Sequence, residues 1–450
     1  MPDTPLRSGR VEAAETVRTT ALSTNGPSAP TSAPSASGDT AANDTPGGRG
    51  IFKTFYSLRF REFRFLWLGM VFLMMGMQMQ MIVRGYLTYE ITSSPFILGL
   101  VNAGFALPML SLALFGGAVA DRMERKRVIQ IGQCMAVALA LFIGVSIVTN
   151  TVTWMHLLFV SMVQGAQFSF LMPARQALVP QLVGRSNLTN AMSLDAAAMS
   201  MTTLIAPSVG GVLYNVIGPE GVYFLISGLC VVAVVFTSMV SARGGSANRP
   251  SVPMASDISQ GLRYVVNSPV VLILLVMGLA TALLAMPFRF LMPVFVVDVY
   301  ERGPESLGLL VTIMGVGSLV GALFIASIGR NRRGLLLLAG SCISAIALML
   351  VAAIPVYYTA AGLMVLLGLG DAGRRTLNQA LIMEEVDDEY RGRVMSVFMM
   401  NFGLMPLGVL PAGALAEEFG GRFAVMLLGV LLMLTTLAVL VTQRRLRELD

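Results

Sequence analysis

Several ionisable side chains lie inside long apolar stretches of this sequence, where a charge is costly unless it has a function or a partner. Among them are the acids Asp195 and Asp371 and the bases Arg84, Arg289 and Arg375. Burial lets a carboxylate hold and release a proton near neutral pH, whereas a neighbouring arginine stabilises its charged form. Asp371 and Arg375 are four residues apart and share a helical face, so they could couple proton movement or neutralise each other. Asp195 is the second candidate for proton coupling.

Polar residues also interrupt the methionine-rich stretch of residues 73–86, which reads LMMGMQMQMIVRGY. Gln80 and Arg84 are four residues apart on one helical face, with Met77 about one turn below. Soft, adaptable methionine side chains suit a promiscuous binding surface, although plain hydrophobic filling is an open alternative. No cysteine or histidine motif accompanies the methionines to favour a copper site. We therefore take Met77, Gln80, Arg84 and Arg289 as candidates for lining a substrate cavity.

The composition places these residues in a membrane protein. Of the 450 residues, 55% are hydrophobic and 12% are charged, against about 25% charged in a typical soluble domain. The mean hydropathy is +0.74. An integral membrane protein embedded in the lipid bilayer is the interpretation that fits these values.

The sequence does not support several functional classes. Lysine occurs only as Lys53 and Lys126, and neither follows the glycine pattern of an ATP-binding phosphate loop. The cysteines are isolated, with neither disulfide nor metal-ligand spacing. Basic residues form short clusters between apolar stretches, which does not suggest nucleic-acid binding. We expect no enzyme activity, no cofactor and no metal site.

Apolar segments long enough to cross a membrane occur repeatedly, since a spanning helix needs about 20 mostly apolar residues. Twelve are expected, six in each half, near residues 65–89, 96–120, 128–149, 153–178, 188–216, 221–241, 269–296, 306–328, 334–355, 357–378, 391–417 and 422–442.

These segments divide the chain into expected domains. Residues 1–50, rich in Ser, Thr, Pro, Ala and Gly, should be a disordered cytoplasmic tail. A six-helix bundle follows over 51–241, then a cytoplasmic linker with an amphipathic helix over 242–268. A second bundle covers 269–443, and 444–450 is a short cytoplasmic tail. Arginine and lysine concentrate in alternate loops, so the positive-inside rule predicts that both termini lie in the cytoplasm. The expected location is the cell (inner) membrane.

The two halves share a sequence pattern. Gly165 is followed eleven residues later by Gln-Ala-Leu, and the same arrangement recurs at Gly368, an offset of 203 residues. A duplicated helical unit is typical of transporters whose halves rock about a central site. This repeat predicts two pseudo-symmetric bundles.

The loop after the second span reads GAVADRMERKRV and resembles the signature of the major facilitator superfamily. Gly117, Asp121, Arg122, Arg125 and Lys126 match it in order, whereas Glu124 replaces a usual glycine. Such a charge cluster can latch the cytoplasmic side in one conformation and release it in another. Simple topology signalling by positive charge is the alternative.

A second element, APSVGG, begins at Ala206 in the fifth span and resembles the Gly-Pro-x-x-Gly-Gly element of exporters in this superfamily. Pro207 removes a helical hydrogen bond and bends the helix. Gly210 and Gly211 allow close packing against a neighbouring helix.

Across residues 55–440, stretches such as SLRFREFRFLWLG and EYRGRVMS resemble the branch of enterobactin exporters and macrolide efflux proteins. The resemblance implies an all-α membrane fold of twelve helices in two bundles. It also implies export of a small apolar or amphipathic compound by alternating access, with protons as the coupling ion and a monomer as the working unit. Ser161, however, stands where proton-coupled exporters commonly carry an arginine. A metabolite importer and a transport-inactive sensor of the same fold remain alternatives.

Overall fold

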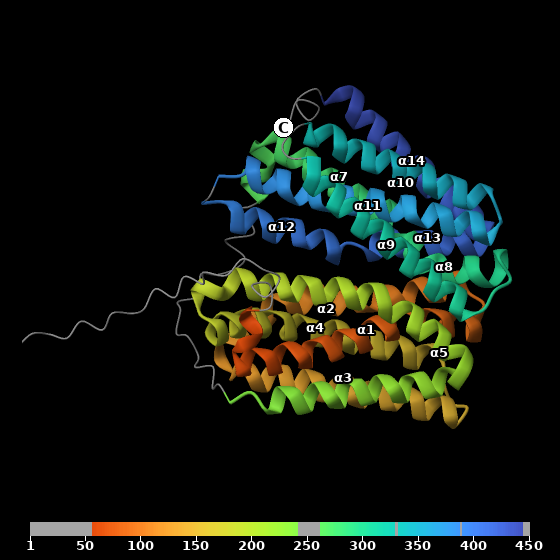
Figure 1. Cartoon of the computed structure of the whole chain (residues 1–450). Coiled ribbons are helices and arrows are strands. Elements are labelled where there is room, and N and C mark those ends of the chain that lie inside the picture. Colours follow the sequence, from red (N-terminus) through yellow and green to blue (C-terminus); the bar gives the residue numbers. More distant parts are fainter. Residues whose placement is uncertain (1–55, 242–261, 329–331, 388, 444–450) are drawn as a thin grey trace, which may run out of the picture. The chain divides into compact units, whose positions relative to one another are not determined.

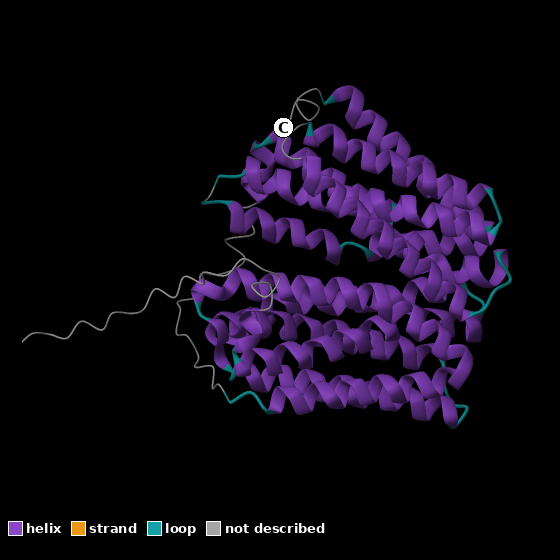
Figure 2. Cartoon of the chain, viewed as in Figure 1, coloured by secondary structure: helices purple, strands orange, loops and turns teal. Residues whose placement is uncertain are grey.

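The computed structural model describes residues 56–241, 262–328, 332–387 and 389–443, without the side chains of 113–122, 185, 328, 396, 399 and 402. Within these ranges the chain is helical almost throughout and contains no strand (Figure 2). The expected tails at 1–50 and 444–450 lie outside the described residues. Of the predicted linker helix, only residues 262–267 are described, and they are helical.

The N-terminal half (residues 56–241) is built from long helices. Its elements are η2 (Tyr56–Arg59), α1 (Arg61–Thr92), α2 (Pro95–Arg122), α3 (Arg125–Val148), α4 (Trp154–Val183), η3 (Arg185–Asn187) and α5 (Leu188–Ser238). The last is broken at Gly218, whose φ of 73° favours glycine, and Pro219 follows. This break separates the two spans predicted near 188–216 and 221–241.

The C-terminal half (residues 262–443) has shorter helices. They are α7 (Pro269–Leu284), α8 (Met286–Val294), η4 (Phe295–Val299), α9 (Pro304–Ile328), α10 (Arg333–Ala353), α11 (Tyr357–Glu385), α12 (Arg391–Gly403), α13 (Pro406–Phe419) and α14 (Gly421–Thr442). Pro287 lies at the start of α8 and Pro406 at the start of α13. Because proline cannot continue the hydrogen bonds of a preceding helix, each predicted span is interrupted there.

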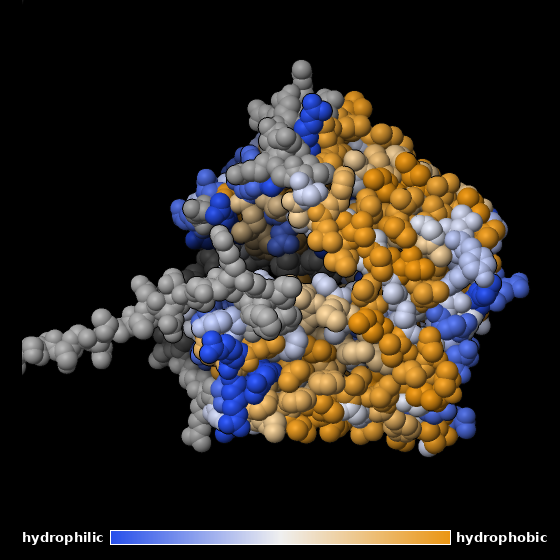
Figure 3. All heavy atoms as spheres, viewed as in Figure 1, coloured by the Kyte–Doolittle hydropathy of each residue, from blue (hydrophilic) through white to orange (hydrophobic). Residues whose placement is uncertain are grey.

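An apolar surface suits these helices to lipid. Among the described residues, nine helical segments are long and apolar enough to cross a membrane, with all of α5 counted as one. Figure 3 shows an apolar band over the sides of the helices and hydrophilic residues toward both ends of the bundle. The all-helical membrane fold is therefore confirmed, while the count of twelve spans stays a prediction.

The two halves pack their helices in the same way (Figure 1). In one, α2 packs against α4, and in the other α9 packs against α11. A Cβ atom on Gly165 of α4 would lie 1.9 Å from the carbonyl oxygen of Phe105, and one on Gly368 of α11 would lie 1.9 Å from that of Met314. Both glycines thus permit the same close helix crossing, which agrees with the repeat seen in the sequence.

Candidate functional site

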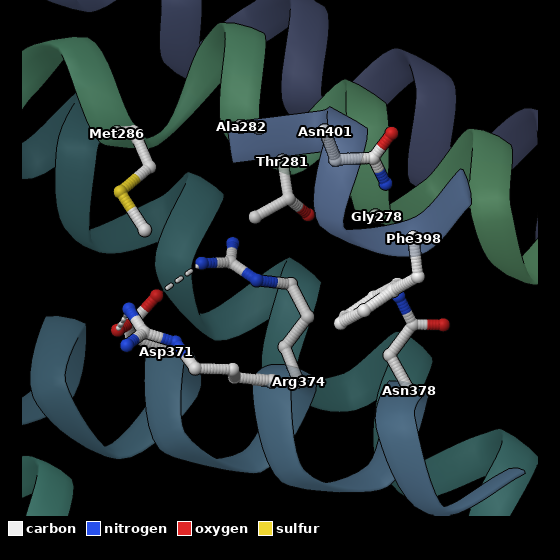
Figure 4. Close-up of a pocket in the computed structure, with 10 residues that line it drawn as sticks. Gly278, Thr281, Ala282, Met286, Asp371, Arg374, Asn378, Phe398 and Asn401 are labelled. Carbon is white, nitrogen blue, oxygen red and sulfur yellow. Dashed lines mark hydrogen bonds and ion pairs between the residues drawn. The ribbon is translucent and has the colours of Figure 1, made fainter. Parts of the chain in front are cut away.

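A charged cluster lies on α11 in the C-terminal half (Figure 4). The Asp371 carboxylate accepts hydrogen bonds from Arg374 Nη2 at 2.6 Å and from Arg375 Nη2 at 2.8 Å. The predicted pairing of Asp371 with Arg375 is present, because both side chains project from one helical face. Arg374 is the more buried partner, with 4% of its side chain exposed against 47% for Arg375.

This cluster lines a small, partly open cavity of about 50 Å³. Its polar lining includes Thr281 and Asn378, and its apolar lining includes Met286 and Phe398. Helices α7, α11 and α12 supply most of these residues, so the cavity lies among these three helices. A site of this kind can bind a compound with both a charged and an apolar part.

Arg289 of α8 lines an adjoining cavity together with Asp371, Arg374 and Arg375. It lies within electrostatic reach of Asp371 and Arg375. Among the described residues, no hydrogen bond or ion pair involves its guanidinium, and its Nε atom is buried without a partner. The structure therefore brings Arg289, a predicted cavity residue, next to the predicted proton-coupling pair.

The N-terminal half contains a separate buried cluster. Arg84 Nη1 donates to Gln164 Oε1 at 2.7 Å, and Gln164 Nε2 donates to Gln80 Oε1 at 2.6 Å. Arg84 and Gln80 are 5% and 3% exposed. Gln164 thus connects α4 to the predicted face of α1. Met77, the fourth cavity candidate, is half-buried and packs against the hydrophobic core of the protein.

Asp195, the second proton-coupling candidate, has a partner that the sequence reasoning missed. Arg175 Nη2 of α4 lies 2.6 Å from Asp195 Oδ1 of α5, and both side chains are largely buried. They line a small cavity with Trp67 and Met70. Arg175 interrupts an apolar stretch as Arg289 does, so the same signal could have identified it.

The exporter-type element of α5 packs against two other helices. Gly210 lies against Met79 of α1, and a Cβ atom on Gly211 would lie 2.4 Å from the carbonyl oxygen of Pro304 in α9. One residue of the element, Ser208, also donates to Thr312 Oγ1 at 2.7 Å. Gly211 therefore permits a close contact between the two halves of the protein, whereas Gly210 packs within the N-terminal half.

The predicted latch is only partly described. The side chains of Gly117, Asp121 and Arg122 lie outside the described residues. Arg125 Nη1 donates to the carbonyl oxygen of Ala177 at 2.9 Å, and Lys126 Nζ donates to that of Ser238 at 3.0 Å. The two described members thus bind backbone carbonyls within their own half.

The part of the chain that the structure describes contains no group of three or more His, Cys, Asp and Glu side chains able to hold a metal ion. The arrangement that it does contain is one of buried arginines with carboxylate or amide partners. Such groups can bind charged ligands or exchange protons, and neither requires a bound metal.

Comparison with known proteins agrees with this description. The chain is 27% identical over 383 residues to the multidrug efflux pump Tap of Mycolicibacterium fortuitum, covering 81% of this chain and 91% of Tap. It is 24% identical to macrolide efflux protein A of Streptococcus pyogenes, covering 82% and 93% of the two chains. It is 26% identical to the enterobactin exporter EntS of Shigella boydii, covering 77% and 85%.

Its fold resembles the crystal structure of the nucleoside transporter NupG, with a TM-score of 0.65, 14% identity and coverage of 86% of this chain and 99% of NupG. The model of the family described as transmembrane secretion effector matches residues 52–450. The chain therefore belongs to the transmembrane secretion effector family of the major facilitator superfamily of membrane transporters.

Proposed function

We propose that this protein exports small apolar or amphipathic compounds across the cell membrane by alternating access, driven by proton antiport. The observation that carries the proposal is the cavity around Asp371. It places a carboxylate, two arginines and apolar side chains together inside the helical bundle. Relatives that are named as efflux pumps and exporters support the outward direction.

Asp371 is the preferred proton carrier in this proposal. Its carboxylate is held by Arg374 and Arg375 in the structure and would have to lose at least one of them to take up a proton. Rearrangement of α11 or arrival of substrate would weaken those ion pairs, and a carboxylate without a cationic partner in an apolar cavity binds a proton more readily. Asp195, with its single partner Arg175, is the alternative carrier.

The decisive experiment measures transport with and without a gradient. Cells that carry the gene should accumulate less of the exported compound from a panel of dyes, macrolides and siderophores than cells without it. An importer would raise the internal concentration, and a sensor would leave it unchanged. Asp371→Asn should abolish uphill, proton-driven efflux while leaving downhill leakage. Continued uphill efflux by this variant would mean that Asp195 carries the proton or that another ion drives export.

The proposal also places the protein in the inner membrane with both termini in the cytoplasm, because of the arginine-rich loops. In a cysteine-free variant, a cysteine at Ser246 should react with an impermeant reagent only from the cytoplasmic side. A cysteine at Ala361, within α11, should be protected. Labelling of position 246 from outside would reverse the orientation.

A further inference from the structure

The paired cavities in the C-terminal half carry an excess of positive charge. The ionisable residues that line them are Arg289, Arg374, Arg375 and Asp371. Three positive charges against one negative charge leave a net charge of +2 among these lining residues. Charges in a low-dielectric bundle interior are retained only where they are paired or used. The Arg375 side chain is 47% exposed, but the single carboxylate of Asp371 still does not balance the two guanidinium groups of Arg289 and Arg374.

The arginines also have hydrogen-bond donors without acceptors. Arg374 is 3% exposed and uses Nη2 on Asp371, while its Nε and Nη1 atoms have no partner. The buried Nε of Arg289 likewise has none. Figure 4 shows the Arg374 guanidinium extending into the space between Asp371, Met286 and Thr281. An oxyanion in that space would accept hydrogen bonds that are now unmade.

The other residues that line the cavities indicate which further chemical groups a ligand would carry. Met286, Phe288 and Phe398 form apolar walls next to the charged cluster. Thr281 Oγ1 and Asn378 Oδ1 are buried without hydrogen-bond partners. An apolar body with a nearby hydroxyl or amide would contact these walls and polar atoms together.

We propose that these cavities bind the carboxylate of an amphipathic substrate, with Arg374 and Arg289 donating to it and Asp371 competing with it for Arg374. This inference rests on the proposed transport function and names the chemical class of its substrate. A planar carboxylate matches the paired donors of a guanidinium. Asp371 accepts one hydrogen bond from Arg374 and one from Arg375, so a substrate carboxylate could take the place of the Asp371 carboxylate on Arg374.

Arg289 also lies where residues of the two halves meet. It lines a third cavity, together with Met81 of α1 and Asn102 of α2. A carboxylate held by Arg289 would therefore lie where residues of both halves converge. In an alternating-access cycle, this is the position from which a ligand can be exposed to either side.

The test measures binding to the purified full-length protein in nanodiscs of phosphatidylcholine. The probes are a dansylated undecanoic acid and its methyl ester, which share an apolar body and differ in charge, with empty nanodiscs correcting for partition into lipid. We expect the acid to bind at least about tenfold more tightly than the ester, since a charge-assisted contact distinguishes them. Arg374→Gln and Arg289→Gln should each remove most of this preference.

Asp371→Asn provides a test of opposite sign. It removes the competing carboxylate, so the acid should bind several-fold more tightly while binding of the ester is unchanged. Arg302→Gln, on a surface arginine stacked against Tyr357, is the matched control and should leave both probes unaffected.

Three binding results would overturn the inference, and a fourth result, from lipid competition, would do so as well. The three binding results are equal binding of acid and ester, weaker binding of the acid to Asp371→Asn, and loss of the preference in Arg84→Gln instead of Arg289→Gln. Displacement of the acid by phosphatidylglycerol added to the nanodiscs would assign the arginines to a lipid headgroup and would also overturn it. Efflux of an uncharged macrolide, measured separately, tests the proposed function, so an exporter without a carboxylate site would be recognised as such.

Discussion

The hydroxyl of Tyr89, near the C-terminal end of α1, donates a hydrogen bond to the Asp298 carboxylate in η4 and so joins the two halves of the protein. Tyr89 is 4% exposed. On the same end of the bundle, Ser94 at the start of α2 donates to Glu417 of α13 at 2.7 Å. Side chains from both halves thus hold this end together, alongside the close contact of α5 with α9.

Loss of the Tyr89 hydroxyl should loosen this end of the protein. Tyr89→Phe leaves the ring in place but removes a hydrogen bond to a charged group, typically worth about 1.5–3 kcal/mol. We expect a larger share of molecules with the two halves separated there. Pulsed electron paramagnetic resonance between spin labels at Ile91 and Phe419 would measure the change in distance. Asp298→Asn, which retains an acceptor, should have a smaller effect, and equal distance distributions in Tyr89→Phe and the parent would contradict the assignment.

A methyl group at Gly211 should force α5 and α9 apart. In Gly211→Ala the new Cβ atom would lie 2.4 Å from the Pro304 carbonyl oxygen, so backbone must move. Overpacking of this kind costs about 1–3 kcal/mol, and we expect a lower midpoint of thermal unfolding and slower transport. Gly228→Ala is the matched control in α5, because a Cβ atom there meets nothing within 4 Å. Similar unfolding midpoints for both variants would show that the close contact is not needed.

Gln164 should stabilise the buried charge of Arg84. Gln164→Leu removes the acceptor at 2.7 Å and leaves the guanidinium without a hydrogen-bonding side chain. Losing a hydrogen bond to a charged group costs about 1.5–3 kcal/mol, which would be measured as a lower unfolding midpoint. Adding Arg84→Met should restore much of the loss, which a double-mutant cycle measures.

The control for that cycle is Gln133→Leu, which removes a buried but neutral hydrogen bond to Thr237. It should cost less than Gln164→Leu, since no charged group loses its hydrogen-bond acceptor. If the two glutamine variants are equally destabilised, or if Arg84→Met restores nothing, then Gln164 does not act through Arg84.

The loop between α2 and α3 should control cycling rather than binding. Asp121→Asn and Arg125→Ala are expected to slow transport severalfold while the affinity for substrate changes little, because a latch acts on the balance between two conformations rather than on substrate contacts. Arg127→Ala is the control, since its pair with Glu124 leaves the Arg127 side chain 73% exposed and surface pairs contribute about 0–1 kcal/mol. Transport assays and probe binding on the same preparations separate the two effects. Unimpaired transport in both Asp121→Asn and Arg125→Ala would reject the latch.

Much of the fold could be predicted from the sequence because its determinants are local. Long apolar stretches can satisfy their backbone in lipid only as helices, and Gly218 lies between two of the predicted spans. The breaks at Pro287 and Pro406, inside predicted spans, were seen only in the structure. The pairing of Asp371 with Arg375 was likewise predictable, since residues four apart meet on any helix. The spacing of Gln80 and Arg84 on one face followed from the same geometry.

The tertiary structure decided which helices meet and which side chains face each other across them. Arg84 and Gln164 are 80 residues apart, and the pairing of Arg175 with Asp195 joins α4 to α5. No helical period relates such residues, because their contact depends on how each helix is rotated and where it crosses its neighbour. The same holds for Arg289, which sequence alone identifies as a costly buried charge. Only the tertiary arrangement places it in one cavity with Asp371 and Arg374, where an excess of positive charge becomes a candidate binding site.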